Sequence, residues 1–166
     1  MKLKRLTELS LLTAVALIIF VVELRFPDIL PIQGMKLGLA NIITVYAVFV
    51  YQPSETAMIV ACRVLLGAMF SGTMISLFYS ASGAVMCLLG MLILKKFLSL
   101  DYIWLCSVIG AIFHNIGQIC AAMLMMRSTA VIWNLPPLIL FGAIAGLFTG
   151  LCAQVLLKRM NNIKKL

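Results

Sequence analysis

Long apolar runs separated by short polar stretches make up most of this chain. The pattern predicts six helices, at about 6–22, 37–51, 54–70, 74–94, 102–126 and 135–157. A helix needs roughly 20 apolar residues to cross a bilayer, and six such runs leave no room for a separate soluble domain. We therefore expect residues 1–166 to form one all-α polytopic transmembrane domain, a six-helix bundle.

Proline and polar residues mark the boundaries of these helices. The longest polar stretch, 23–35, is expected to be a loop. Pro53 or Ser54 is expected to open the helix at 54–70, and Pro136-Pro137 the helix at 135–157, because proline is tolerated in a first helical turn.

Composition excludes a water-soluble globular protein. Hydrophobic residues make up 64% of the chain and charged residues 11%, with a mean hydropathy of +1.15. Too few polar side chains remain to cover a core in water, so we expect the lipid bilayer to surround the helices. The five cysteines form no C-x-x-C pair, which gives no indication of a zinc site or a disulfide framework. The residues predict no metal and no cofactor.

The formal net charge of +8 is concentrated at the ends of the apolar runs. With the N-terminus inside, three cations fall outside: Arg25, Lys36 and Arg127. Nine fall inside: Lys2, Lys4, Arg5, Lys95, Lys96, Lys158, Arg159, Lys164 and Lys165. The positive-inside rule then predicts a multi-pass protein of the cell membrane with both termini cytoplasmic, and no nucleic-acid partner is needed to explain the charge.

Arg63 is the most informative single residue, because it lies within the apolar run at 54–70. A guanidinium near mid-membrane costs at least about 2.5 kcal/mol on insertion scales and must find acceptors. The acidic residues all fall near the membrane faces: Glu8, Glu55 and Asp101 near the inner one, Glu23 and Asp28 near the outer one. An ion pair would require Arg63 to snorkel or Glu23 to reach inward; the alternative acceptor is an anionic ligand.

A polar stripe of His114, Asn115 and Gln118 interrupts the helix at 102–126. At about 1.5 Å per residue from the inner ends of their helices, Arg63 lies roughly 13 Å and His114 roughly 18 Å into the membrane, so both can share one layer. Two interpretations stay open. The layer forms a pocket for a polar or anionic group, or it is a hydrogen-bond network that locks the bundle.

Lys36 and Asn41 stand at the start of the helix at 37–51. A cation beside the exposed N–H groups of a helix N-terminus suits an anion, and Asn41 continues the polar line toward the interior. The alternative is an ordinary interfacial lysine.

Small residues at four-residue spacing predict close helix packing. Gly142, Gly146 and Gly150 share one face of the helix at 135–157, and the partner of that face is either another helix of this chain or another subunit. Ser10 and Ala14 form a weaker pair on the helix at 6–22.

The string Pro31-Ile32-Gln33-Gly34-Met35-Lys36-Leu37-Gly38-Leu39-Ala40-Asn41-Ile42-Ile43-Thr44 carries a family resemblance. With Arg63, Gly67 and the segment 114–118, it resembles the Gx transporter family, often labelled heptaprenyl diphosphate synthase component I. That family is related to the substrate-binding S components of energy-coupling-factor transporters. The similarity extends over most of the chain.

The resemblance implies an S-component-like bundle with a ligand pocket toward the outer side, beneath the loop between the first two helices. In S components, alanines four apart on the first helix dock a coupling subunit, and Ser10 with Ala14 is the nearest match here. That imperfect match also allows a solo or differently partnered protein. The family resemblance further implies an association with flavin-linked and quinone-linked redox systems.

Our leading hypothesis is therefore a membrane substrate-binding or transport subunit for a small ligand, which is anionic, cofactor-like or isoprenoid-like. Arg63, His114, Asn115 and Gln118 would form the floor of its site, and Lys36 with Asn41 the entrance. The alternative is a non-transporting scaffold for a redox or isoprenoid-biosynthesis partner, held through the glycine face. Prenyl chain elongation needs clustered aspartates to hold magnesium, whereas Asp28 and Asp101 are far apart, so we do not expect this chain alone to be the enzyme.

Overall fold

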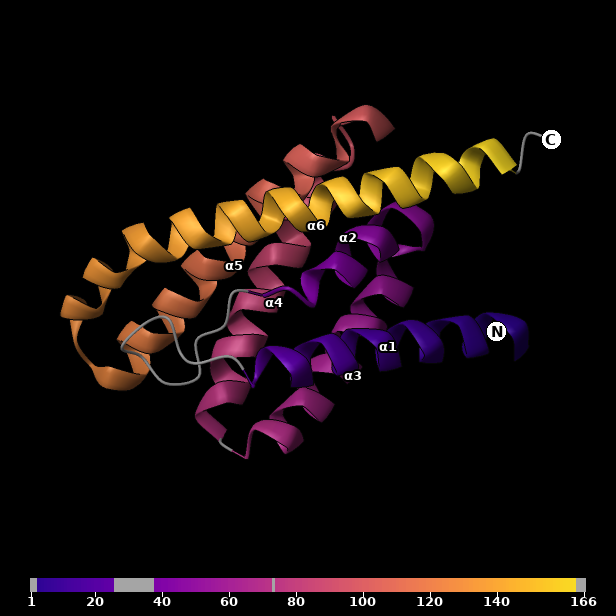
Figure 1. Ribbon diagram of the computed structural model, residues 1–166. Coiled ribbons are helices and arrows are strands. Elements are labelled where there is room, and N and C mark those ends of the chain that lie inside the picture. The colour runs from indigo at the N-terminus through magenta and orange to yellow at the C-terminus, as the bar shows by residue number, and fades with distance from the viewer. Residues whose placement is uncertain (1–2, 26–37, 73, 164–166) are drawn as a thin grey trace.

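The computed structural model describes residues 3–25, 38–72 and 74–163, with side chains as far as Met160. All regular structure in that part of the chain is helical, which confirms the all-α prediction (Figure 1). The short 3-10 helices η1 (Leu100–Tyr102) and η2 (Thr129–Asn134) lead into α5 and α6. The six α-helices are α1 (Leu3–Glu23), α2 (Asn41–Val50), α3 (Pro53–Ser71), α4 (Met74–Leu94), α5 (Ile103–Met126) and α6 (Leu135–Ile163).

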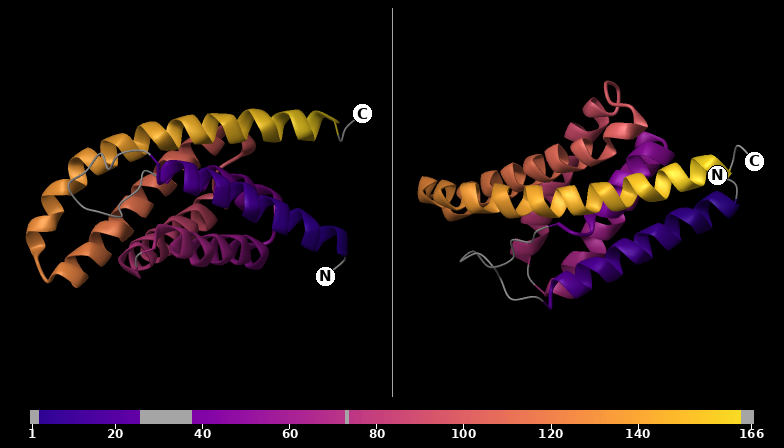
Figure 2. Two further views of the ribbon diagram at one scale, coloured as in Figure 1. Left: turned by 60° about the horizontal axis from the view of Figure 1, so that its bottom comes forward. Right: turned by 45° about the horizontal axis from the view of Figure 1, so that its top comes forward.

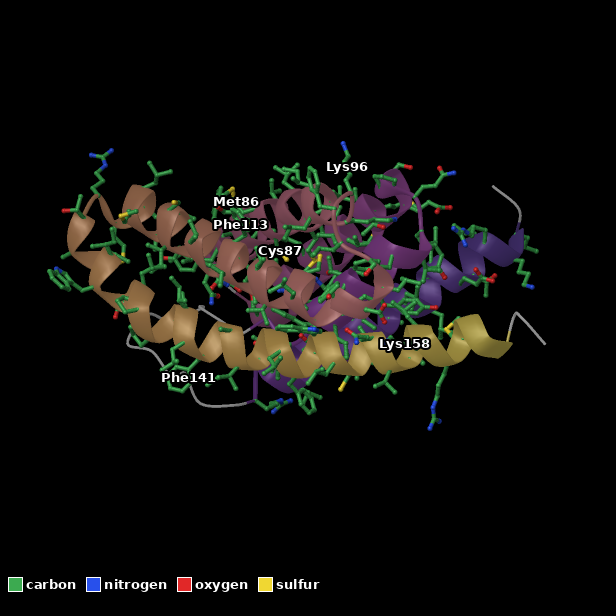
Figure 3. The ribbon with its side chains drawn as sticks, turned by 90° about the horizontal axis from the view of Figure 1, so that it is seen from above. Met86, Cys87, Lys96, Phe113, Phe141 and Lys158 are labelled. Carbon is green, nitrogen blue, oxygen red and sulfur yellow. The ribbon has the colours of Figure 1, made fainter. Side chains whose placement is uncertain are left out.

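Five of these helices, α1, α3, α4, α5 and α6, are long and apolar enough to cross a membrane. Their outward faces carry large apolar side chains, among which Leu11, Leu124 and Phe148 each expose more than half of their surface. Phe141 likewise points away from the other helices on the outer side of α6 (Figure 3). A surface of this kind suits lipid rather than water, so the chain is a membrane protein.

Helix α2 is shorter than the sequence pattern predicted. It starts at Asn41 instead of residue 37 and has 10 residues, which gives a length of about 15 Å, half the thickness of a bilayer core of about 30 Å. Gly38 explains the late start, because its backbone φ of +78° lies in the left-handed region that interrupts a right-handed helix. The structure therefore corrects the expected helix at 37–51 to one of 10 residues, which reaches only about half-way across a bilayer core.

The other helix boundaries follow local signals in the sequence. Pro53 is the first residue of α3, and the backbone N–H of Gln52 donates to Glu55 Oε2 at 3.0 Å, which satisfies a donor at the start of that helix. Gly72, with φ of +69°, ends α3. Helix α4 has the predicted bounds, whereas α6 extends to Ile163, six residues beyond the predicted end at 157.

Helix α5 packs between α4 and α6 and is the centre of the bundle (Figure 1). A Cβ added at Gly117 would lie 2.9 Å from the Cα of Gly83 on α4. On the opposite side of α5, a Cβ added at Gly146 or Gly150 would lie 3.0 Å from the Cα of Val108 or 2.7 Å from that of Trp104. Contacts this short require glycine, so both interfaces depend on backbones that touch.

The glycine face of α6 is thus occupied by α5 of the same chain. Gly142 completes it, because a Cβ there would meet Asn115 Nδ2. Of the two partners that the sequence allowed for this face, the structure shows the intramolecular one. A scaffold that holds another protein through Gly142, Gly146 and Gly150 therefore has no exposed surface to use.

The beginning of α1 and the end of α6 lie at the same end of the bundle (Figure 2). At this end, Arg5 donates to both carboxylate oxygens of Glu55, at 2.9 and 2.8 Å, and its guanidinium lies 4.0 Å from the centre of the Tyr51 ring. Lys158 pairs with Asp101 at 2.7 Å. These ion pairs tie α1 to α3 and α6 to η1 at the end to which the sequence assigns most of the positive charge.

Candidate functional site

A small cavity lies where the end of α1 and the start of α2 meet α3, α4 and α5. Its volume of about 20 Å³ has room for about one water molecule. Its lining residues come from five parts of the chain that are distant in sequence: Phe20, Glu23, Gly38, Ala40, Arg63, Val64, Ser80, His114 and Gln118. Three of the predicted ligand-binding residues, Arg63, His114 and Gln118, are therefore brought together.

Arg63 contributes the positive charge of this cavity. It lies on the buried face of α3 between Val60 and Val64, and only 6% of its surface is exposed. Its Nη1 donates to Asn41 Oδ1 at 3.2 Å. A guanidinium has five N–H donors, yet in the described part of the chain Arg63 forms this one hydrogen bond. Most of its hydrogen-bonding capacity is left for something else in the cavity.

Glu23 brings a carboxylate to the same cavity from the last turn of α1. The side chain is buried, and its Oε1 accepts a hydrogen bond of 2.7 Å from the backbone N–H of Gly38. From the sequence, Glu23 was considered only as an ion-pair partner that would have to reach inward to Arg63. It does reach the cavity, and its negative charge acts on Arg63. Its signal in the sequence was its position directly after an apolar run.

His114 and Gln118 line the cavity from α5, one helical turn apart. The imidazole ring of His114 is held between two glycines. A Cβ added at Gly83 would lie 2.8 Å from its Cε1, and one added at Gly38 would lie 3.4 Å from its Cδ2. Gln118 is 1% exposed, and its Oε1 has no hydrogen-bond partner among the described residues. Such an orphaned acceptor is costly unless water or a ligand supplies a donor.

Asn115 faces a different neighbour from the other two members of the polar stripe. It does not line the cavity; its Nδ2 donates to the backbone oxygen of Leu138 on α6 at 2.7 Å. A step of one residue turns a helix by about 100°, which directs Asn115 toward α6 while His114 faces the cavity. The structure thus separates Asn115, which joins α5 to α6, from His114 and Gln118.

The remaining predicted site residues lie around the cavity or away from it. Asn41, the first residue of α2, stands behind Arg63 as its acceptor, and its Nδ2 has no partner among the described residues. Lys36 lies outside the described residues. Ser10 and Ala14 are both exposed on the outward face of α1. Gly38, which belongs to the string that carries the family resemblance, also lines the cavity; Ser80 does so without having been predicted, and no local pattern distinguished it.

With this geometry established, comparison with known proteins assigns the chain to a family. Residues 12–156 match the model of the heptaprenyl diphosphate synthase component I family. The chain belongs to this family. The match includes every described residue that lines the cavity. Component I, as a name, implies a partner subunit for family members. Neither the comparison with curated proteins nor that with solved structures returned a match.

Proposed function

We propose that this member of the heptaprenyl diphosphate synthase component I family is a membrane substrate-binding or transport subunit, similar in role to an S component. The main support for the proposal is the environment of the Arg63 side chain. A buried guanidinium with one hydrogen bond lines a cavity together with the orphaned acceptor of Gln118. Each is costly to keep in a bilayer and useful if a polar ligand binds there.

The depth of the cavity favours binding over a simple surface role. Arg63 is ten residues from Pro53 at the start of α3, or about 15 Å along the helix axis. This distance is half of a hydrocarbon core of about 30 Å. Polar groups at this depth that face a cavity instead of lipid are characteristic of substrate and ion pathways.

The ligand is proposed to come from the outer side. Arg5, Lys95 and Lys158 lie near the end of the bundle that holds the two termini, and the positive-inside rule assigns that end to the cytoplasm. The cavity-lining residues Glu23 and Gly38 flank segment 24–37. They belong to the half of the bundle away from the two termini. Lys36 keeps its proposed role near the entrance, whereas Asn41 supports Arg63 inside the bundle.

A partner subunit is part of this proposal. The exposed pair Ser10 and Ala14 leaves a shallow strip on α1 where another helix can approach closely, as expected of a docking site for a coupling subunit. A non-transporting subunit of a flavin-linked, quinone-linked or isoprenoid system would use the same strip with a different partner, since the glycine face of α6 is covered.

The test is ligand-dependent stabilisation of the purified protein in detergent. Vitamins, flavins, quinones and prenyl diphosphates are screened for a rise in the midpoint of thermal unfolding, first with wild-type protein and then with Arg63→Ala. Lys96→Ala removes a cation that points away from the bundle and is the matched control (Figure 3). We expect at least one class to stabilise wild type and the control but not Arg63→Ala. Absence of stabilisation by every class contradicts the proposal.

A further inference from the structure

We infer that the ligand of this site carries an oxyanion, a carboxylate or phosphate group, which binds between Arg63 and the N-terminus of α2. This inference rests on the proposed function and specifies the chemistry of the ligand. It is drawn from the hydrogen-bonding groups that surround the cavity and from the way α2 begins.

Two donor side chains lie near the start of α2: Arg63 in the cavity lining and Asn41 behind it. Arg63 uses one of its five N–H groups, on Asn41 Oδ1, and the Nδ2 of Asn41 has no partner among the described residues. Both side chains are at least nine-tenths buried. A ligand that satisfies them must offer several acceptor atoms close together, and an oxyanion does so with negative charge that also matches the guanidinium.

The backbone adds a further positive potential at the same place. Ala40, the residue before the first residue of α2, lines the cavity, so the N-terminus of a 10-residue helix lies beside it. A helix N-terminus carries roughly half a positive charge, and this one lies beside a buried cavity, where little solvent screens it. A discontinuous helix of this kind is how several transporters hold an anionic substrate group.

Glu23 limits where the oxyanion can sit. Its carboxylate lines the same cavity, accepts from the backbone N–H of Gly38 and acts on Arg63 through its charge. Because Glu23 already takes the backbone N–H of Gly38 and like charges repel, the oxyanion is placed against the Arg63 guanidinium. Gln118 Oε1, an acceptor, favours a ligand with an O–H or N–H group near the oxyanion.

The experiment compares pairs of compounds that differ in their anionic group. The pairs are pantothenate and panthenol, flavin mononucleotide and riboflavin, and farnesyl diphosphate and farnesol. Equilibrium binding is measured on the full chain in detergent, for wild type, Arg63→Gln and the exposed control Lys96→Gln. We expect the anionic member of at least one pair to bind at least tenfold more tightly, and Arg63→Gln to remove that preference while Lys96→Gln keeps it.

Gln118→Glu is the second variant, in case Arg63→Gln does not fold. It places a carboxylate in the cavity and is expected to weaken the anionic member selectively. Equal weakening of both members overturns the inference. So does an uncharged member that binds as tightly as its anionic partner, although the proposed function then still stands. If no member of any pair binds, both the inference and the proposed function are overturned.

Discussion

The carboxylate of Glu23 accepts a hydrogen bond from the backbone N–H of Gly38, with 2.7 Å between Oε1 and N. This contact holds the last turn of α1 against the residue from which the chain turns into α2. Gly38 also faces Asn41 and His114, so one glycine adjoins three polar side chains around the cavity. The position of α2, and hence of its N-terminus, depends on this residue.

Gly38→Ala is expected to destabilise the protein more than Gly72→Ala. Both glycines have positive φ, which costs an alanine about 1–2 kcal/mol at either site. Only at Gly38 would the new Cβ also crowd a neighbour, 2.7 Å from Asn41 Nδ2, whereas Gly72 has no atom within 4 Å. Because Arg63 holds the Asn41 amide, we expect an additional loss of about 1–3 kcal/mol. Chemical unfolding of the two variants in detergent measures the difference, and equal losses would contradict the crowding.

Gly146→Leu is expected to destabilise the isolated chain by about 3 kcal/mol, because the new side chain would meet Ala111 Cβ and the backbone of α5, which cannot move aside. Ala14→Leu is the matched control, since Ala14 is exposed on α1, and its effect should stay within about 0.5 kcal/mol. The unfolding free energies of the two variants, measured without any partner, decide the point. A stable Gly146→Leu protein would mean that α5 and α6 do not pack as described.

Asn115→Ala and Gln118→Met should separate packing from binding. Asn115 donates to Leu138 on α6, so its loss should lower the free energy of unfolding by about 1–3 kcal/mol without changing ligand affinity in the folded protein. Gln118→Met keeps the volume in the cavity and should change stability by less than about 1.5 kcal/mol, while it weakens binding. Paired unfolding and binding measurements check both. The reverse pattern would place the ligand between α5 and α6.

Ser128→Cys and Lys96→Cys, each in a cysteine-free background, test the orientation in the membrane. Both positions are exposed, before η2 and after α4 respectively. The positive-inside rule predicts that a membrane-impermeant maleimide labels position 128 on intact cells and position 96 only after permeabilisation. Labelling in the opposite order would put the termini outside and turn the cavity toward the cytoplasm.

The sequence predicted well what depends on local chemistry. The apolar runs set the number of helices, Pro53 opens α3, and the bounds of α4 agree with the structure. It predicted less well what depends on how helices meet. The left-handed backbone at Gly38 shortened α2, the turn of α5 separated Asn115 from Gln118, and only three-dimensional packing brings Glu23 to the cavity of Arg63. The hydrophobic periodicity of one helix does not show how the neighbouring helix is rotated against it.

A high-resolution cryo-electron microscopy map of the protein, purified with the tightest-binding compound of the screen, tests the central claim most directly. We predict non-protein density within hydrogen-bonding distance of the Arg63 guanidinium and beside the first turn of α2, with the lining side chains moved apart to admit it. A map in which the bound compound lies elsewhere, and Arg63 contacts only protein atoms and water, would contradict the account.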